Sequence, residues 1–303
     1  MERVYNNENE IAYLIQAYAD AAAFKNLVKV LLDMGNCHIF VHLDKKSDIT
    51  NFLVEDKNVH FIDEREFVSW AGYNQGKLMF NLIDAALSFP IKFGRYCFIS
   101  ESDFPVYSKD ELLEKIKLSL PIMINCSKLQ KHKVERYWFY DYRIKSPKAN
   151  KIVSKAINGL MGMLYKIHIL RKPNKVILDG RLVDVYCSGP FWQFDYEQLK
   201  YINDTFKNNK KFQKYFKTSF AACELMVQTI IANSKYMEEC KVMDKYINLN
   251  ALSSLCYFKY TGPRVNVLTE EDYNDIVLSG KPFIRKVNVN KSQTLVEKIV
   301  TKW

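Results

Sequence analysis

Three acidic residues follow apolar segments of this chain, and they are the first residues that suggest chemistry. Asp44 comes directly after the run CHIFVHL, and Glu101 and Asp103 follow the run YCFIS. Short apolar runs of this kind are typical of buried strands. In open α/β sheets, ligands bind outside the carboxyl ends of the strands. The spacing therefore predicts that these carboxylates lie near a ligand, at the edge of a sheet.

The elements that must position these carboxylates follow from the apolar pattern. Asp20 stands where a helix N-cap belongs, apolar residues then recur at three- and four-residue steps, and Gly35 stands where that helix would end. Because this helix lies between two apolar runs, the segment is a βαβ unit with parallel strands. The expected strands are 11–15, 37–43, 59–62, 96–100, 185–194 with an interruption at 188–190, and 283–287. Further helices are expected at 74–87, at 220–232, between 269 and 280, and at 291–303.

This order of elements predicts an α/β fold with a mostly parallel central sheet flanked by helices. We find no internal repeat, low-complexity segment or linker, so we expect a single domain over residues 1–303. Of the 303 residues, 48% are hydrophobic and 26% are charged, which is ordinary for a globular protein.

Charge and cysteine usage narrow the class of protein. The net charge of +10 attracts polyanions, but no RNP pattern, zinc-ligand spacing or helix-turn-helix is present, so nucleic acid is not an expected partner. Seven cysteines, an odd number without a CxxC pair, indicate free thiols in a reducing compartment. The polar N-terminal segment is unlike a signal peptide, and no apolar stretch approaches the ~20 residues that cross a bilayer. We therefore expect a cytoplasmic protein.

Residues 128–175 are rich in Lys, Arg and Tyr and are expected to form loops and one basic helix. Within them, residues 151–172 combine apolar residues at three- or four-residue steps with several cations. The apolar residues are Ile152, Ile157, Leu160, Met161, Leu164 and Ile167, and the cations are Lys151, Lys155, Lys166, Arg171 and Lys172. Such a helix either packs on the sheet or lies on an anionic membrane surface, which would make the protein peripheral on the inner face of the membrane.

Seven segments resemble one family in their order and spacing. They are IAYLIQAYADAAAFKNLVKVL, IFVHLDKKSD, VSWAGYNQGKLMFNLIDAAL, YCFISESDFPVYSKDEL, CSGPFWQFDYEQLKYI, CELMVQTIIANS and VLTEEDYNDIVLSGKPFIRKV, within residues 11–287. These segments are similar to the core-2/I-branching β-1,6-N-acetylglucosaminyltransferase family, which includes the peptide O-xylosyltransferases. The resemblance implies a GT-A-like fold and inverting transfer of a sugar, by default GlcNAc, from a UDP donor to a hydroxyl of a glycan acceptor. It also implies chemistry without a bound metal, and the chain is most similar to soluble bacterial members.

An inverting transfer needs a base to take the proton of the acceptor hydroxyl. The resemblance implies that Glu224, in CELMVQTI, is this base, because it is similar to the catalytic Glu of the family. Its place at the start of an expected helix would hold the carboxylate as an anion. Cys223 stands where the family has Asp.

The leaving diphosphate needs cationic support. Lys286 is similar to the diphosphate-binding Lys of the family, and Arg285 lies beside it. Leu278 stands opposite the second cation of the family, so Lys281, Arg285 and Arg264 are the candidates to replace it.

The resemblance also implies contacts with the two substrates. These are Asp44, Trp70 and Tyr73 on the donor side, and Asp103, Glu135, Arg136 and Trp192 on the acceptor side. Core packing is an equal interpretation of the two tryptophans. Since Glu101 stands where the family has Gly, Glu101 and Asp103 form an E-x-D pair, whose hard oxygens could hold Mn²⁺ or Mg²⁺. We favour the metal-independent alternative.

Two other functions are compatible with these residues. Cys223 and Leu278 depart from the family pattern, as in a non-catalytic carbohydrate-binding protein on a decayed transferase scaffold. A membrane-surface or nucleic-acid-binding protein driven by charge would bind with steep salt dependence and without affinity for nucleotide sugars. The positions of Glu224 and Lys286 favour an enzyme of polysaccharide or lipopolysaccharide assembly, whose glycan acceptor would be lipid-linked if the membrane alternative holds.

Overall fold

A computed structural model of the chain describes residues 5–118, 123–131, 134–142, 151–243, 248–261 and 264–303. Its centre is a five-stranded sheet in the order β10-β4-β1-β2-β3. The strands are β1 (Tyr5–Ala17), β2 (Cys37–Leu43), β3 (Val59–Phe61), β4 (Ile91–Ser100) and β10 (Trp192–Phe194). The first four run parallel and β10 is antiparallel to β4. The prediction of a mixed α/β fold with a mostly parallel sheet is confirmed.

The predicted βαβ unit is present at the start of the chain. Helix α1 (Ala21–Met34) begins where the side chain of Asp20 accepts a hydrogen bond from the amide of Ala23, over 3.0 Å. It ends at Gly35, whose φ of 72° is in the left-handed region that glycine adopts at little cost. Because β1 lies between β4 and β2, the loops after these three strands meet at one edge of the sheet.

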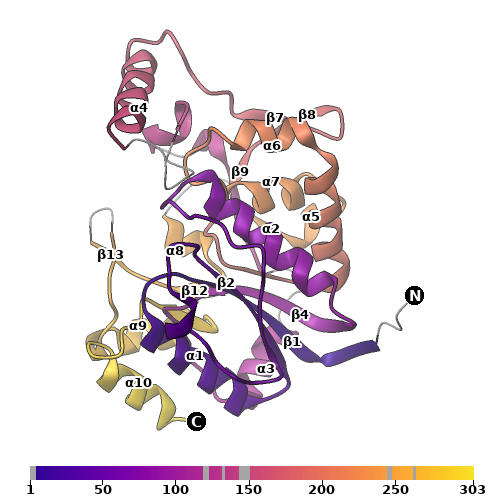
Figure 1. The fold of residues 1–303 in the computed structure, drawn as a ribbon, viewed down its shortest axis with the longest axis vertical. Coiled ribbons are helices and arrows are strands. Elements are labelled where there is room, and N and C mark those ends of the chain that lie inside the picture. Colours follow the sequence, from indigo (N-terminus) through magenta and orange to yellow (C-terminus); the bar gives the residue numbers. More distant parts are fainter. Residues whose placement is uncertain (1–4, 119–122, 132–133, 143–150, 244–247, 262–263) are drawn as a thin grey trace.

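Helices cover both faces of this sheet (Figure 1). Helices α1 and α3 (Lys109–Leu118) lie on one face, and α2 (Tyr73–Leu87), α5 (Tyr196–Asn208) and α7 (Met226–Ala232) lie on the other. Helix α6 (Lys210–Phe216) follows α5 and packs on the hairpin of β7 (Lys175–Leu178) and β8 (Arg181–Asp184).

A second hydrophobic cluster lies beside the central sheet, around the three-stranded sheet β12-β15-β5. These strands are β5 (Asp103–Pro105), β12 (Cys256–Tyr257) and β15 (Phe283–Arg285), and helices α9 (Tyr273–Ser279) and α10 (Gln293–Val300) complete the cluster. The predicted capping box between Thr269 and Asp272 is present in η6 (Glu270–Asp272), and Gly280 ends α9 with a φ of 63°. The expected strand at 283–287 therefore exists, but outside the central sheet.

The remaining short elements surround the site described below. The sheet β11-β6-β9 contains β6 (Asn125–Lys128), β9 (Tyr186–Cys187) and β11 (Lys241–Val242). The others are η1 (Ile49–Asn51), η2 (Leu129–Lys131), η3 (Glu135–Trp138), η4 (Ala222–Glu224), η5 (Met237–Glu239), α8 (Leu249–Leu252), β13 (Tyr260–Thr261) and β14 (Arg264–Val265). Helix α4 (Lys151–Lys166) projects from the body of the protein (Figure 1). The expectation of one helix over 220–232 was wrong, because a 3₁₀ turn, η4, precedes α7.

All seven cysteines are buried free thiols, as the sequence predicted. Within the described ranges, no helix is both long enough and apolar enough to cross a bilayer.

Candidate active site

Glu224 lies in a turn that backbone contacts hold in place. Ala221, just before η4, has a φ of 48°, and its amide donates to the carbonyl of Ala71 over 2.8 Å. Ala71 is also in the left-handed region, with a φ of 56°. Helix α2 approaches so closely that a Cβ atom on Gly76 would lie 3.2 Å from the amide nitrogen of Cys223. Glycine at this position therefore allows α2 to pack against the turn that carries Glu224.

The carboxyl group of Glu224 is hydrogen-bonded in a poorly solvated place. The hydroxyl of Tyr137 donates to Oε2 of Glu224 over 2.5 Å, and the thiol of Cys187 donates to the same hydroxyl over 3.6 Å. Burial raises the pKa of Glu224 to about 7, while the hydrogen bond from Tyr137 acts to lower it. The expectation that a helix start would hold this group as an anion is not met, because desolvation dominates. A carboxylate with a pKa near 7 is suited to accept a proton at neutral pH.

Aromatic rings and one guanidinium group pack around Phe220, which contacts the Tyr137 ring beside this carboxylate. Phe220 contacts the ring of Tyr137 edge-on at 5.3 Å between centroids and the ring of Trp70 at 6.0 Å. The guanidinium of Arg136 lies 4.6 Å from the centre of the Phe220 ring and 3.3 Å from a carboxylate oxygen of Asp141. Trp70 is 66% exposed. An exposed ring beside a proton acceptor offers an apolar surface on which a ligand could stack.

Asp103 and Arg285 pair across the small sheet, where β5 and β15 are antiparallel and these two residues face one another. Nε of Arg285 lies 3.5 Å from Oδ1 of Asp103, and the amide and hydroxyl of Ser100 each donate to the same carboxylate over 2.8 Å. Burial raises the pKa of Asp103, although the charge of Arg285 acts to lower it. The guanidinium of Arg285 also lies 4.4 Å from the centre of the Phe191 ring. Asp103 is buried, so it orients Arg285 and does not face a ligand.

Lys286 differs from Arg285 in having no partner. Its backbone accepts from the amide of Leu268 and donates to the carbonyl of Asn266. Its half-exposed ammonium makes no hydrogen bond or ion pair in the part of the chain that the structure describes. Burial raises the pKa of Asp103, and the charge of Lys286, which directly follows Arg285 in the sequence, acts to lower it. Arg285 is therefore an oriented cation, and Lys286, next to it in the sequence, is a cation without a side-chain partner among the described residues.

Residues 188–191 connect the Glu224 turn with these cations. The amide of Ser188 donates to the carbonyl of Glu224 over 3.0 Å, and Phe191, at the other end of the segment, packs against Arg285. The charge of Arg285 also lowers the pKa of the buried thiol of Cys223, although burial raises that pKa more strongly. Residues 188–191 thus link the Glu224 turn to Arg285, although the two lie far apart in the sequence.

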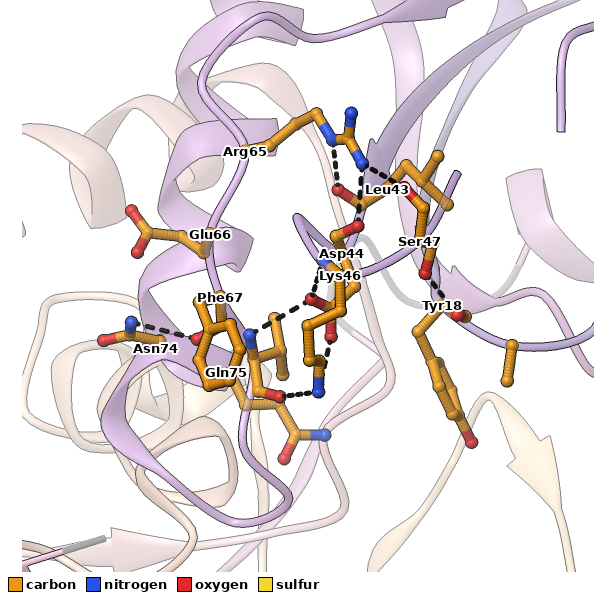
Figure 2. A network of polar contacts seen from close by, with 12 residues as sticks. Tyr18, Leu43, Asp44, Lys46, Ser47, Arg65, Glu66, Phe67, Asn74 and Gln75 are labelled. Carbon is orange, nitrogen blue, oxygen red and sulfur yellow. Dashed lines mark hydrogen bonds and ion pairs between the residues drawn. The ribbon is translucent and has the colours of Figure 1, made fainter. Parts of the chain in front are cut away.

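Asp44 stabilises the loop that follows β2, as Figure 2 shows. Its carboxylate accepts from the amides of Lys46 and Val68, over 3.0 and 3.4 Å, and pairs with the ammonium of Lys46 at 3.1 Å. Arg65 donates to three backbone carbonyl groups of the same loop (Figure 2). Because Asp44 is only 2% exposed, it shapes the loop and has little surface left for a ligand.

Glu101 is engaged in a similar way at the end of β4. Its carboxylate accepts from the backbone amides of Tyr18, Ala19 and Asp20, over 2.5 to 3.3 Å, and so fixes the loop between β1 and α1. Glu101 and Asp103 therefore follow the same strand but bind different partners. Among the described residues, no group of three or more His, Cys, Asp or Glu side chains is placed to hold a metal ion.

Comparison with known proteins decides the family. A family model described as Core-2/I-Branching enzyme matches residues 11–162, which is half of the chain. The chain belongs to the core-2/I-branching enzyme family. A comparison with curated proteins gave no match. The match contains Trp70, Arg136 and Tyr137, whereas Glu224 and Lys286 lie beyond it.

Several other residues of this core-2/I-branching enzyme were predicted to contact the donor, and the structure places them differently. Tyr73 is buried in the core, and Arg264 is exposed on β14. Lys281 donates to the backbone carbonyl and the side chain of Asn250, over 2.6 and 2.9 Å, and burial lowers its pKa to about 8. The ammonium of Lys281 is therefore engaged by Asn250. Leu278, which the resemblance placed opposite a cation of the family, is 85% exposed.

The acceptor-side predictions for this family member need two corrections. Trp192 is fully buried in β10 of the central sheet, 5.3 Å from the ring centre of Phe98, so it cannot contact an acceptor. Asp103 is also buried, where it pairs with Arg285. Glu135 and Arg136 instead line a cavity of about 500 Å³ between η3 and α4. Tyr137, beside them in η3, was not predicted, although the sequence pointed to its two neighbours.

Proposed function

We propose that this core-2/I-branching enzyme transfers GlcNAc from UDP-GlcNAc to a hydroxyl group of a glycan acceptor, with inversion at the anomeric carbon and on a GT-A-like fold. The family supports a glycosyltransferase. The single observation that carries the mechanism is Glu224, whose carboxyl group accepts a hydrogen bond from Tyr137 and whose pKa burial raises to about 7. The pathway we propose is assembly of a cell-surface polysaccharide or lipopolysaccharide.

The reaction would be one in-line displacement. The acceptor hydroxyl gives its proton to the carboxylate of Glu224, and its oxygen forms a bond to the anomeric carbon of the donor sugar. The bond between that carbon and the diphosphate oxygen breaks, and UDP leaves with the electron pair. Tyr137 keeps one oxygen of Glu224 oriented, so the other oxygen is the one that would accept the proton.

Negative charge develops on the leaving diphosphate, and fixed cations stabilise such charge without reorganisation. We assign this role to Lys286 and Arg285. Asp103 and Phe191 orient Arg285, and Lys286 has no competing partner among the described residues. We further propose that no divalent metal is needed, which the engagement of Glu101 with backbone amides supports.

On the sugar side, we propose that Trp70 stacks on a substrate ring and that Arg136 contacts an acceptor hydroxyl. Both residues pack against Phe220, which lies beside Tyr137 and so near the base. The free thiols of all seven cysteines favour work in a reducing compartment.

Thermal unfolding with nucleotide sugars tests the donor assignment. A ligand at a hundredfold excess over its Kd stabilises the folded state by ~2.7 kcal/mol, so UDP-GlcNAc should raise the Tm, and EDTA should leave that rise unchanged. GDP-mannose serves as the control and should give no shift. A protein that shifts with no UDP-sugar, or that binds glycans but never releases UDP from UDP-GlcNAc, would contradict the proposal and favour a non-catalytic carbohydrate-binding protein.

The pH dependence of kcat/KM follows from the pKa of Glu224. Since the base must be unprotonated in the free enzyme, kcat/KM should rise with pH through about 7 and then level. The Tyr137→Phe variant loses the hydrogen bond that lowers this pKa, so its rise should move to higher pH. Tyr142→Phe, whose hydrogen bonds come from its backbone, is the control. A profile that is flat through neutral pH, or identical in the Tyr137 variant, would contradict the assignment.

A further inference from the structure

Helix α4 presents its apolar side to the solvent. The exposed apolar residues include Ile157, Leu160 and Met163 of α4 and Ile167 and Ile169 just beyond it, and we refer to these five as the apolar strip. Their exposed fractions range from 38% to 69%. The three strip residues in α4 lie within about a third of the circumference of the helix.

The opposite side of α4 is the side that holds it to the protein. The hydroxyl of Ser154 donates to the carbonyl of Tyr142 over 2.8 Å, and the amide of Tyr142 donates to the side chain of Asn158 over 2.7 Å. The ring of Tyr165 lies 6.1 Å from that of Phe139. In a surface helix of a globular protein the apolar side normally faces the core. The alternative that α4 packs its apolar side on the sheet is therefore wrong.

The sequence around the strip is basic, although Glu135 lines the cavity beside Met163 and Lys166. Residues 142–178 contain nine Lys and Arg and no Asp or Glu. Lys155 and Lys166 are exposed on α4, and Arg171 is exposed against the ring of Trp138. The prediction that Lys172 is one of the surface cations was wrong. Lys172 is buried and donates to Tyr215 and Thr218, over 2.9 Å each.

We propose that the apolar strip docks on an anionic lipid bilayer, with α4 lying in the plane of the interface. An exposed apolar side flanked by lysines is the arrangement that interfacial helices use, since both the acyl boundary and the anionic headgroups are bound. A second copy of this chain is the less suitable occupant. A two-fold dimer through the strip would bring the same basic surface against itself, and like charges would repel.

The position of the strip links this surface to the site. The cavity beside η3 is lined on its other side by Gly159, Gly162, Met163 and Lys166 of α4. Tyr137, next to Arg136 in η3, contacts Glu224. Docking would thus bring the acceptor side of the enzyme to the membrane, where a lipid-linked glycan is held. This last consequence rests on the proposed function, whereas the docking itself does not.

Vesicle co-sedimentation without nucleotide sugar tests the docking. The protein should bind vesicles of phosphatidylglycerol and phosphatidylcholine mixed in equal parts, and raised NaCl should release it. The Leu160→Gln/Met163→Gln/Ile167→Gln variant should bind at least ~10-fold more weakly, since it removes the apolar contact and keeps a good helix former. Lys155→Gln/Lys166→Gln should lose ~5- to 30-fold. Lys25→Gln/Lys29→Gln, on the exposed side of α1, removes the same charge and should bind like the unmodified protein.

Circular dichroism on each variant shows whether it is folded. Equal binding to pure phosphatidylcholine vesicles, or no binding to either kind, would overturn the proposal. So would a dimer in vesicle-free solution that the Leu160→Gln/Met163→Gln/Ile167→Gln variant dissolves, because the occupant would then be a second copy. Because no sugar donor is present, an error in the transferase assignment leaves all of these outcomes unchanged.

Discussion

The Glu224→Gln variant is expected to lose ~10²–10⁴ in kcat while its affinity for UDP-GlcNAc stays nearly unchanged. Glutamine keeps the shape of the side chain and an oxygen that can accept from Tyr137, so the turn should be preserved. It cannot take a proton from the acceptor hydroxyl. The loss therefore belongs to the chemical step and should appear in single-turnover rates as fully as in kcat.

Glu55→Gln, an exposed carboxylate on a surface loop, is the matched control and should retain full activity. Donor affinity measured by calorimetry separates a catalytic role from a structural one. If Glu224→Gln turns over at the unmodified rate, the base is another group. If it loses donor affinity together with kcat, Glu224 holds the fold of the site and does not act on the acceptor.

The Lys286→Ala variant is expected to lower kcat/KM by ~10²–10³, the usual effect of removing one group that stabilises developing charge. Among the described residues Lys286 has no side-chain partner, so under the proposed function its ammonium would be available to the diphosphate. EDTA should leave the rate of the unmodified enzyme intact. Lys291→Ala, an exposed lysine shortly after it, removes the same charge and should be close to normal.

Restoration of an EDTA-treated enzyme by Mn²⁺ would contradict the metal-independent mechanism. It would return attention to Glu101 and Asp103, whose carboxylates would then have to leave the backbone amides and Arg285 that they bind here. An unchanged rate in Lys286→Ala would move the leaving-group role to Arg285 alone.

Local patterns in the sequence were sufficient to predict most helices and strands. Asp20 and Gly35 bound α1 as their types suggest, and the strand CHIFVHL is β2 without a change of limits. Asp44 and Glu101 follow strands that end at one edge of the central sheet, since β4 and β2 flank β1, whereas their predicted place near a ligand stays a prediction. These features depend on periodicity and capping, which neighbouring residues determine.

The roles of the site residues could not be predicted in the same way, because their partners are distant in the sequence. Tyr137 and Glu224 are 87 residues apart, and Glu101 is 83 residues from Tyr18. The role of Trp192 could not be decided from the sequence either. A tryptophan in a strand of the central sheet and one in a sugar cleft have the same local sequence pattern. Only the packing of β10 against β4 distinguishes them.

The two left-handed alanines have a consequence for how the enzyme begins each cycle. Left-handed backbone costs ~1–3 kcal/mol for a residue with a Cβ atom, so neither Ala71 nor Ala221 would adopt it in an isolated peptide. Their mutual hydrogen bond and the contact at Gly76 offset that cost during folding. Substrate binding then need not order the turn that carries Glu224. Under the proposed function, a donor that binds beside Trp70 would find Glu224 already in position, and its binding free energy would remain for the reacting atoms.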